Sequence, residues 1–213
     1  VLSQLSKTDK LETNLTVGAS SLPVQSFFGS NFDSSISLND YETPYLESGE
    51  GGLGLGATYQ LGDSRLLVGM TNPINQSSDS VIGLRKSLVA SLEYGNPADS
   101  AITFMAGVTQ DKDSLLGSTG DSAYSLSGSK SNTTFTAFKA QTQLGQDLSL
   151  TGIATLANTN MTRPDNSFIN SASNVKSTSV SLIANKGNVF GDDSMSLFVS
   201  QPNRVSDGSM SIR

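Results

Sequence analysis

Cysteine and histidine are both absent from this 213-residue sequence. Without cysteine, the chain has neither a disulfide framework nor a thiolate metal site. Cysteine usage therefore does not indicate whether the protein works in an oxidising or a reducing compartment. Without histidine, it lacks the usual general base and the commonest metal ligand, and a Ser-His-Asp triad is impossible. No spacing of Ser118, Ser127 or Ser129 to a lysine supports a serine–lysine dyad. We therefore expect no catalytic residue, no cofactor and no metal ion.

Basic side chains and long apolar runs are also scarce. The chain has 13 Lys and Arg against 19 Asp and Glu, with a net charge of −6 and no local cluster of Lys or Arg along the sequence. This balance argues against nucleic acid as a partner. No run of 18 apolar residues is present, so no membrane-spanning helix is expected. That test does not detect a membrane-spanning strand, whose signal is alternation over about ten residues.

Alternation of apolar with polar or small residues is what the sequence does contain. In Ala101–Val108 it is broken only at Met105, and in Leu148–Leu156 only at Ile153. A period of two residues indicates strands, and short turns rich in Gly, Asn or Asp join such stretches into antiparallel hairpins. Four hairpins are predicted, pairing 52–61 with 65–70, 81–94 with 101–108, 133–144 with 148–157, and 176–186 with 194–205.

Long polar loops are predicted between these hairpins, at Thr71–Ser80, Gln110–Asn132 and Asn158–Val175. Short turns at one end and long loops at the other are typical of transmembrane barrels. Most of the predicted strands are also longer than the strands of soluble proteins, which average about five or six residues. The predicted fold class is all-β, an antiparallel up-and-down meander of about eight strands in this fragment, barrel-like and of the outer-membrane type. The absence of Trp leaves little material for an aromatic girdle, so a soluble β sandwich stays as the alternative.

Two regions follow from the pattern. Residues 1–50 are expected to be an irregular linker, with a short helix over Val1–Thr16 from its loose leucine spacing, and residues 51–213 an antiparallel β domain. The acidic residues Glu42, Glu47 and Glu50 are expected on solvated surface. The chain opens without Met or a targeting leader, so we expect it to be a segment of a longer precursor.

Two motifs resemble ligand sites only superficially. Gly52–Ala57 fits the spacing of a dinucleotide fingerprint, but it runs into an alternating strand, so no helix N-terminus faces a phosphate. Asp111-Lys-Asp113-Ser114 begins like a calcium loop, but Leu116 stands where such loops need Gly. We expect Ser114 in a solvated loop, where Ser114→Arg is silent.

A family resemblance rests on two longer motifs and one short one. The first motif consists of Asp113, Ser114, Leu115, Leu116, Gly117 and Ser118, followed by Tyr124-Ser-Leu-Ser-Gly128. The second runs from Gly191 to Val205 and includes Ser200, Gln201, Pro202, Arg204 and Val205, with Asn203 where the family has an apolar residue. The third and weaker match is Ser35–Tyr41. From about Ser35 onward the chain resembles the C-terminal β domain of bacterial secreted subtilisin-like serine peptidases, the autotransporter-like group.

The resemblance implies a non-catalytic translocator or anchor barrel at the outer membrane or cell surface of a Gram-negative bacterium, behind a serine peptidase domain that lies upstream. It also implies further strands after Arg213, so the β domain of residues 51–213 is expected to be incomplete at its C-terminal end. Its implied partners are outer-membrane lipid, that peptidase domain, or another chain that supplies closing strands. The alternative is a soluble accessory β domain, secreted or periplasmic, that assists folding of the peptidase or binds substrate or cell-surface polymer for it. In either case the motif residues have structural roles.

Overall fold

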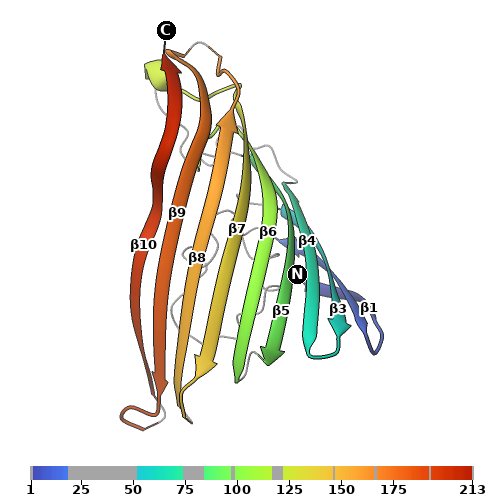
Figure 1. The fold of residues 1–213 in the computed structure, drawn as a ribbon. Coiled ribbons are helices and arrows are strands. Elements are labelled where there is room, and N and C mark those ends of the chain that lie inside the picture. The colour runs from blue at the N-terminus through green and yellow to red at the C-terminus, as the bar shows by residue number, and fades with distance from the viewer. Residues whose placement is uncertain are drawn as a thin grey trace.

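The computed structural model describes residues 2–18, 52–73, 84–96, 99–116, 122–145, 147–165, 167–191 and 193–212. Ten strands form one antiparallel sheet in chain order (Figure 1). Their bounds are β1 Leu2–Lys7, β2 Leu11–Gly18, β3 Gly52–Leu61, β4 Ser64–Pro73, β5 Leu84–Asn96, β6 Ser100–Lys112, β7 Lys130–Gln143, β8 Leu148–Met161, β9 Ile169–Gly187 and β10 Ser194–Ile212. The all-β, up-and-down antiparallel meander predicted from alternation is therefore confirmed.

Helical structure in these ranges is limited to one 3-10 turn, η1, at Ser122–Tyr124. None of the helices in the described part of the chain is long and apolar enough to cross a membrane.

All four predicted hairpins are present. The turn between β3 and β4 is tight, and Gly62 occupies it with a φ of 61°, a conformation that glycine adopts without steric cost. The predicted helix over Val1–Thr16 is wrong, because β1 and β2 form a fifth hairpin there. In β2 the residues from Leu11 to Gly18 pair in register with β3, and this ladder outweighs a weak helical spacing. The described chain thus has ten strands rather than eight. The predicted irregular segment at 20–50 lies outside the described residues.

The strands extend beyond their apolar stretches, so two predicted loops are shorter than expected. β8 continues to Met161 and β9 begins at Ile169, which reduces the predicted loop Asn158–Val175 to residues 162–168. β6 likewise continues to Lys112, and β7 begins at Lys130. The alternation of apolar with polar residues fades in these extensions, but side chains on β6 and β7 still alternate between buried and exposed, and Gln110 pairs with Asn132. Hydropathy alone marks where the apolar pattern ends and not where hydrogen bonding ends.

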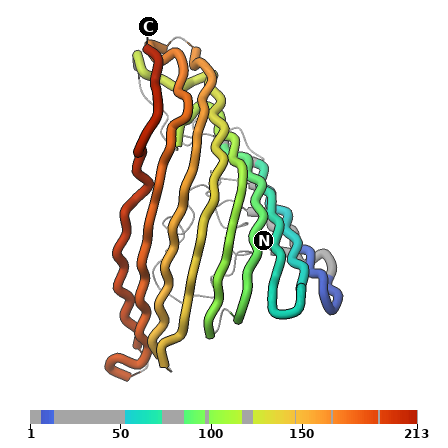
Figure 2. The backbone as a smooth tube through the Cα atoms, in the orientation of Figure 1, coloured from blue at the N-terminus to red at the C-terminus, as the bar shows by residue number. Residues whose placement is uncertain are grey.

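The sheet is twisted and open (Figures 1 and 2). β1 lies at one edge and β10 at the other, and they do not pair with each other, so the described strands do not close into a barrel. The short hairpin turns gather at one end of the sheet, and the opposite end carries the longer connections and the C-terminus (Figure 2). At that end β9 and β10 extend past the earlier strands (Figure 1).

Buried apolar side chains form three clusters. The largest joins Leu67, Val89, Met105, Phe135, Ala137 and Ala157 across β4 to β8. A second lies at the loop end and joins Leu126, Met161, Ile169, Ala172 and Val175. The third pairs Ile153 with Ile183. Met105 and Ile153, the two residues that broke the sequence alternation, are therefore core residues, and they face away from the apolar rows of their own strands.

Candidate functional site

The first sequence motif forms a structural loop after β6. Asp113 has a φ of 60°, and its Oδ1 accepts a 2.6 Å hydrogen bond from the Gly128 N–H. Ser114 is buried, and its carbonyl oxygen accepts a 2.8 Å hydrogen bond from Ser131 Oγ. The predicted solvated position of Ser114 is therefore wrong, and we now expect Ser114→Arg to be destabilising. The polar sequence around Ser114 predicted an exposed loop. The hydrogen bond from Ser131 on β7 instead holds Ser114 in a buried position.

The rest of that motif supports packing in its described part. Leu115 and Leu116 are half-buried and pack against the cluster at the loop end, and Leu116 also contacts the larger cluster. Gly117 and Ser118 lie outside the described residues. The motif therefore anchors a loop onto the inside of the sheet.

The second motif lies on the edge strand β10. Ser200 pairs with Ser181 and Gln201 with Val180, and the ladder resumes at Arg204, opposite Thr178. The register shift between Gln201 and Arg204 places Pro202 and Asn203 in a bulge, which explains how proline and a polar residue are tolerated there. Val205 then pairs with Ser177. Strands β7, β8 and β9 separate this motif from the first, so the two do not form one site.

The superficial ligand motifs have structural roles. Residues 52–57 lie within β3. Asp111 is buried and paired with Arg85 across β5 and β6, with Nη2 2.9 Å from Oδ2. Among the described residues there is no group of three or more Asp, Glu, His or Cys that could hold a metal. Glu42, Glu47 and Glu50 lie outside them.

One face of the sheet, here called the inward face, is buried and unusually polar. Among the described residues, 19 buried side chains are polar or charged and 14 are apolar. Most of the polar ones are Ser or Thr that alternate along β4 to β9, and Thr133 and Thr159 bond to each other at 2.8 Å. A second ion pair joins Arg65 to the buried Glu93, with Nη2 2.6 Å from Oε1. Buried charges occur in proteins when they are paired, and both of these pairs satisfy that condition.

Several inward hydroxyls have no hydrogen-bond partner within the part of the chain that the structure describes. They include Thr71, Ser87, Ser91, Thr109, Thr151 and Thr155. In a dry core each such group would cost about 1–3 kcal/mol. These unpartnered hydroxyls, together with the buried ion pairs, make the inward face more polar than an ordinary hydrophobic core.

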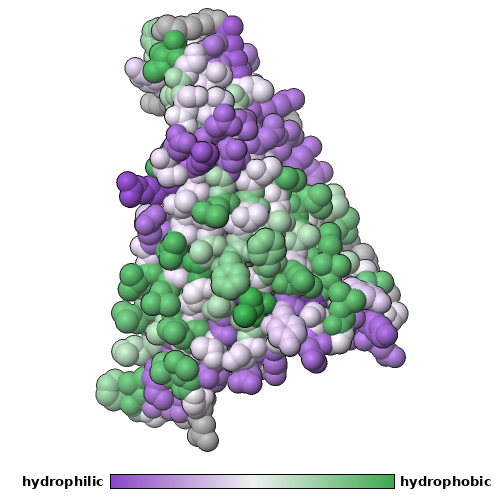
Figure 3. Space-filling view, in the orientation of Figure 1, coloured by the Kyte–Doolittle hydropathy of each residue, from purple (hydrophilic) through white to green (hydrophobic). Residues whose placement is uncertain are grey.

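The opposite face, here called the outward face, carries a continuous apolar band. The band consists of Leu55, Tyr59, Leu61, Leu66, Val68, Met70, Leu88, Leu92, Tyr94, Ile102, Phe104, Val108, Phe138, Leu156, Val180, Leu182, Leu197 and Val199. Phe104 is 54% exposed and Leu156 is 61% exposed, although both lie in the middle of long strands. Figure 3 shows this band as a green zone across the sheet, below a purple zone of hydrophilic residues.

The band ends at an ordered polar row near the loop end. Gln110 on β6 pairs with Lys86 on β5 and with Asn132 on β7, and Asn132 pairs with Asn160 on β8. Asn72 stands at the same level on β4, one residue beyond the Thr71–Ser87 pair. This set of five residues is called the polar row below.

Farther toward β10 the boundary contains an ion pair. Lys176 Nζ donates a 2.9 Å hydrogen bond to Asp207 Oδ2. That bond, together with one from the Gly208 N–H, holds the pKa of Asp207 below its ordinary value. The charge of Lys176 is thus balanced by Asp207 on the neighbouring strand β10, in the part of the sheet beyond the apolar band.

No protein-family model, curated protein or solved structure matches this chain. The two faces are therefore the observations on which a function must rest. Sequence alternation located both rows of side chains but left open which row faces outward. It missed the buried pairs of Arg85 and Arg65, because their partners are 26 and 28 residues away.

Proposed function

We propose that this chain is part of an outer-membrane β barrel that serves as the non-catalytic translocator or anchor domain of a secreted subtilisin-like serine peptidase. The observation that carries the proposal is the direction of the two faces. Apolar side chains point outward along β3 to β10, and hydroxyl and paired charged side chains point inward. Outer-membrane barrels have this arrangement, with an apolar exterior and a polar interior.

The number of exposed apolar side chains favours lipid over water as the surroundings of the outward face. Among the described residues, 27 large apolar side chains are exposed, against 14 buried apolar residues. Burying one side chain the size of Leu or Phe contributes about 1.5–3 kcal/mol, so a water-soluble sheet would forgo most of its available hydrophobic stabilisation. An exposed apolar patch of this extent marks an interaction surface. A bilayer covers the whole band at once, whereas a protein partner would have to cover many adjacent strands.

The extent of the band fits the thickness of a membrane. On β6 it extends from Ile102 to Val108, about 20 Å at ~3.3 Å per residue. Barrel exteriors carry an apolar belt about 25 Å tall on strands that tilt. The loop asymmetry agrees with this placement, since the short turns lie together at one end and the longer connections at the other.

The open edges determine what a membrane-inserted form needs. Unpaired backbone N–H and C=O groups are not tolerated in hydrocarbon. The edges of β1 and β10 therefore pair, in our proposal, with further strands of the same precursor or with strands of another chain. The link to a peptidase rests on the resemblance of the Asp113–Ser118 and Ser200–Val205 motifs. The described part of the first motif anchors a loop, and the second lies on the edge strand β10.

The same open edges favour a second candidate function. A soluble accessory β domain of the peptidase, which binds substrate or cell-surface polymer, does not need a closed sheet. In that case the apolar band is covered by protein and not by lipid.

Membrane fractionation of cells that express the full precursor tests the proposal. We expect the β domain in carbonate-washed outer membranes, extracted only by detergent, with faster migration in unheated than in heated SDS samples. A freely soluble domain with no such heat-dependent shift refutes the membrane proposal and leaves the accessory domain.

A further inference from the structure

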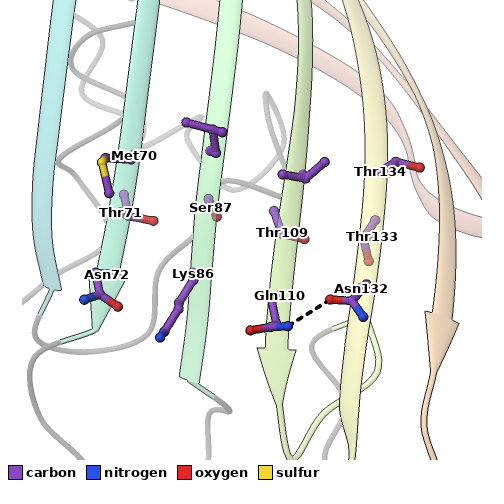
Figure 4. Close-up of a pocket in the computed structure, with 12 residues that line it drawn as sticks. Met70, Thr71, Asn72, Lys86, Ser87, Thr109, Gln110, Asn132, Thr133 and Thr134 are labelled. Carbon is purple, nitrogen blue, oxygen red and sulfur yellow. Dashed lines mark hydrogen bonds between the residues drawn. The ribbon is translucent and has the colours of Figure 1, made fainter.

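An open groove of about 630 Å³ crosses β4 to β7 where the apolar band meets the polar row (Figure 4). Its lining includes apolar Met70, Leu88 and Val108 on one side and polar Asn72, Lys86 and Gln110 on the other. These side chains are exposed, whereas Thr71, Ser87 and Thr109 between them are buried behind the backbone. The groove therefore lies on the outward face and is apolar toward the band and polar toward the loop end.

Three lysines gather at the polar side of this groove. Lys86 projects from β5 beside Gln110, which donates a 3.0 Å hydrogen bond to Asn132 (Figure 4). One row farther toward the loops, Lys112 and Lys130 are direct cross-strand partners on the outward face. Because Lys86 opposes Gln110, it is a diagonal neighbour of Lys112, at about 7–8 Å. The fold thus brings together three cations that are far apart in the sequence.

Among the described residues of these two rows, no carboxylate balances the three cations. The described outward residues of the two rows are Asn72, Gln110, Asn132, Asn160 and Thr162, besides the lysines. Asp111 faces inward to Arg85, and Asp113 accepts the Gly128 N–H. Like charges directly opposite each other in a sheet are destabilising, so the Lys112–Lys130 pair favours an anion between them. Lys176, at the corresponding boundary on β9, already has Asp207.

We propose that this groove binds a phosphate-bearing lipid, with its headgroup phosphate held by Lys86, Lys112 and Lys130 and an acyl chain lying along Met70, Leu88 and Val108. The inference rests on the proposed membrane placement, which sets the apolar side of the groove in hydrocarbon and the lysines at headgroup level. Three ammonium groups and the amides of Asn72 and Gln110 donate hydrogen bonds, and phosphate oxygens accept them. Charge and shape thus complement one amphipathic anion.

The test uses the whole chain folded in dodecyl maltoside micelles and titrated with dioleoylphosphatidylglycerol, while dioleoylphosphatidylcholine and inorganic phosphate serve as separate probes. Bound lipid is counted by native mass spectrometry. We expect the phosphatidylglycerol affinity to exceed that for phosphatidylcholine and to fall on the order of a hundredfold in the variant K86Q/K112Q/K130Q, since each lysine near a lipid surface contributes about a factor of five. Lys176→Gln, the matched control, retains the wild-type affinity.

Three results overturn the lipid site: equal affinity for the two lipids, wild-type phosphatidylglycerol affinity in the triple variant, or equal loss in Lys176→Gln. Binding of inorganic phosphate as tightly as phosphatidylglycerol also overturns it, because the acyl chain then contributes nothing. Flotation of the wild-type precursor, which supplies the strands proposed to pair with β1 and β10, is measured in parallel with vesicles of pure phosphatidylcholine. Failure to float contradicts the membrane placement, whereas flotation without lysine-dependent binding contradicts only the lipid site.

Discussion

At the residue scale, Phe104 discriminates between lipid and protein as the covering of the apolar band. It lies in mid-strand on β6 and is more than half exposed. If lipid covers it, Phe104→Ala is mild because acyl chains fill the space, and Phe104→Arg costs about 2–4 kcal/mol near the bilayer midplane. If protein covers it, Phe104→Ala costs about 3–5 kcal/mol. Urea unfolding of the precursor's β domain inserted in vesicles, with the edges of β1 and β10 paired, measures the cost of both substitutions.

The matched control for that prediction is Gln110→Arg, on the same strand and the same face but in the polar row. We expect it to leave the unfolding free energy nearly unchanged, since arginine there reaches the headgroup level. If Gln110→Arg lowers the unfolding free energy as much as Phe104→Arg does, the cost of arginine does not depend on its depth in the bilayer. That result would contradict lipid as the covering of the apolar band.

The buried ion pair of Arg85 and Asp111 gives a second prediction at this scale. Removing one partner leaves an uncompensated buried charge, so Asp111→Ala should lower the unfolding free energy by about 3–5 kcal/mol. The double variant R85M/D111L should recover much of that loss, because no charge remains. Urea titration of the two variants against wild type checks this. A double variant as unstable as Asp111→Ala would mean that the residues act through packing and not through charge.

At the element scale, the packing of the Phe135 ring on β7 against β6 depends on a glycine, Gly107. A Cβ on Gly107 would lie 2.6 Å from Phe135 Cζ and 2.9 Å from the Leu88 carbonyl oxygen. Phe135 is buried in the largest cluster and has little room to move, so Gly107→Ala should cost about 1–3 kcal/mol through overpacking. Gly152→Ala on β8 is the control, since nothing lies within 4 Å of its added methyl. Equal thermal stability of the two variants would contradict the packing account.

The sequence predicted the strands well where apolar–polar alternation is flanked by residues that favour a tight turn. Gly62-Asp63 and the apolar rows of β3, β5 and β6 fix hairpins whose register needs no distant information. It failed over Val1–Thr16, because the strands there depend on pairing with β3 across 33 residues that separate Gly18 from Gly52. The sequence also predicted loops where polar residues such as Asn160 continue a strand. Hydropathy cannot distinguish a loop from a strand whose outward residues are polar.

The candidate sites were less predictable than the strands. A scan along the chain finds no basic cluster, yet register brings Lys86, Lys112 and Lys130 together on three neighbouring strands. Ser114 looked solvated and is buried, because its carbonyl meets Ser131 on β7. Both errors have one cause: the neighbours that decide the role of a side chain in a sheet lie across strands and not along the chain.

At the scale of the whole molecule, the central claim is that the outward face contacts lipid while the inward face does not. The chain contains no tryptophan, so one introduced indole is the only tryptophan fluorophore. Phe104→Trp places it in the apolar band, and Phe135→Trp places it in the inward cluster on the neighbouring strand β7. Both substitutions replace one aromatic ring with another, and circular dichroism confirms that each variant keeps its sheet.

The most direct measurement is the quenching of these two indoles in vesicles made with brominated phosphatidylcholine. We predict strong quenching of Trp emission in the Phe104→Trp variant by bromines placed deep in the acyl chains, and little in the Phe135→Trp variant. Aqueous iodide should quench neither variant strongly. Emission from the Phe104→Trp variant that iodide quenches and bromolipids do not, or equal bromolipid quenching in both variants, would contradict the claim that the apolar band faces the membrane.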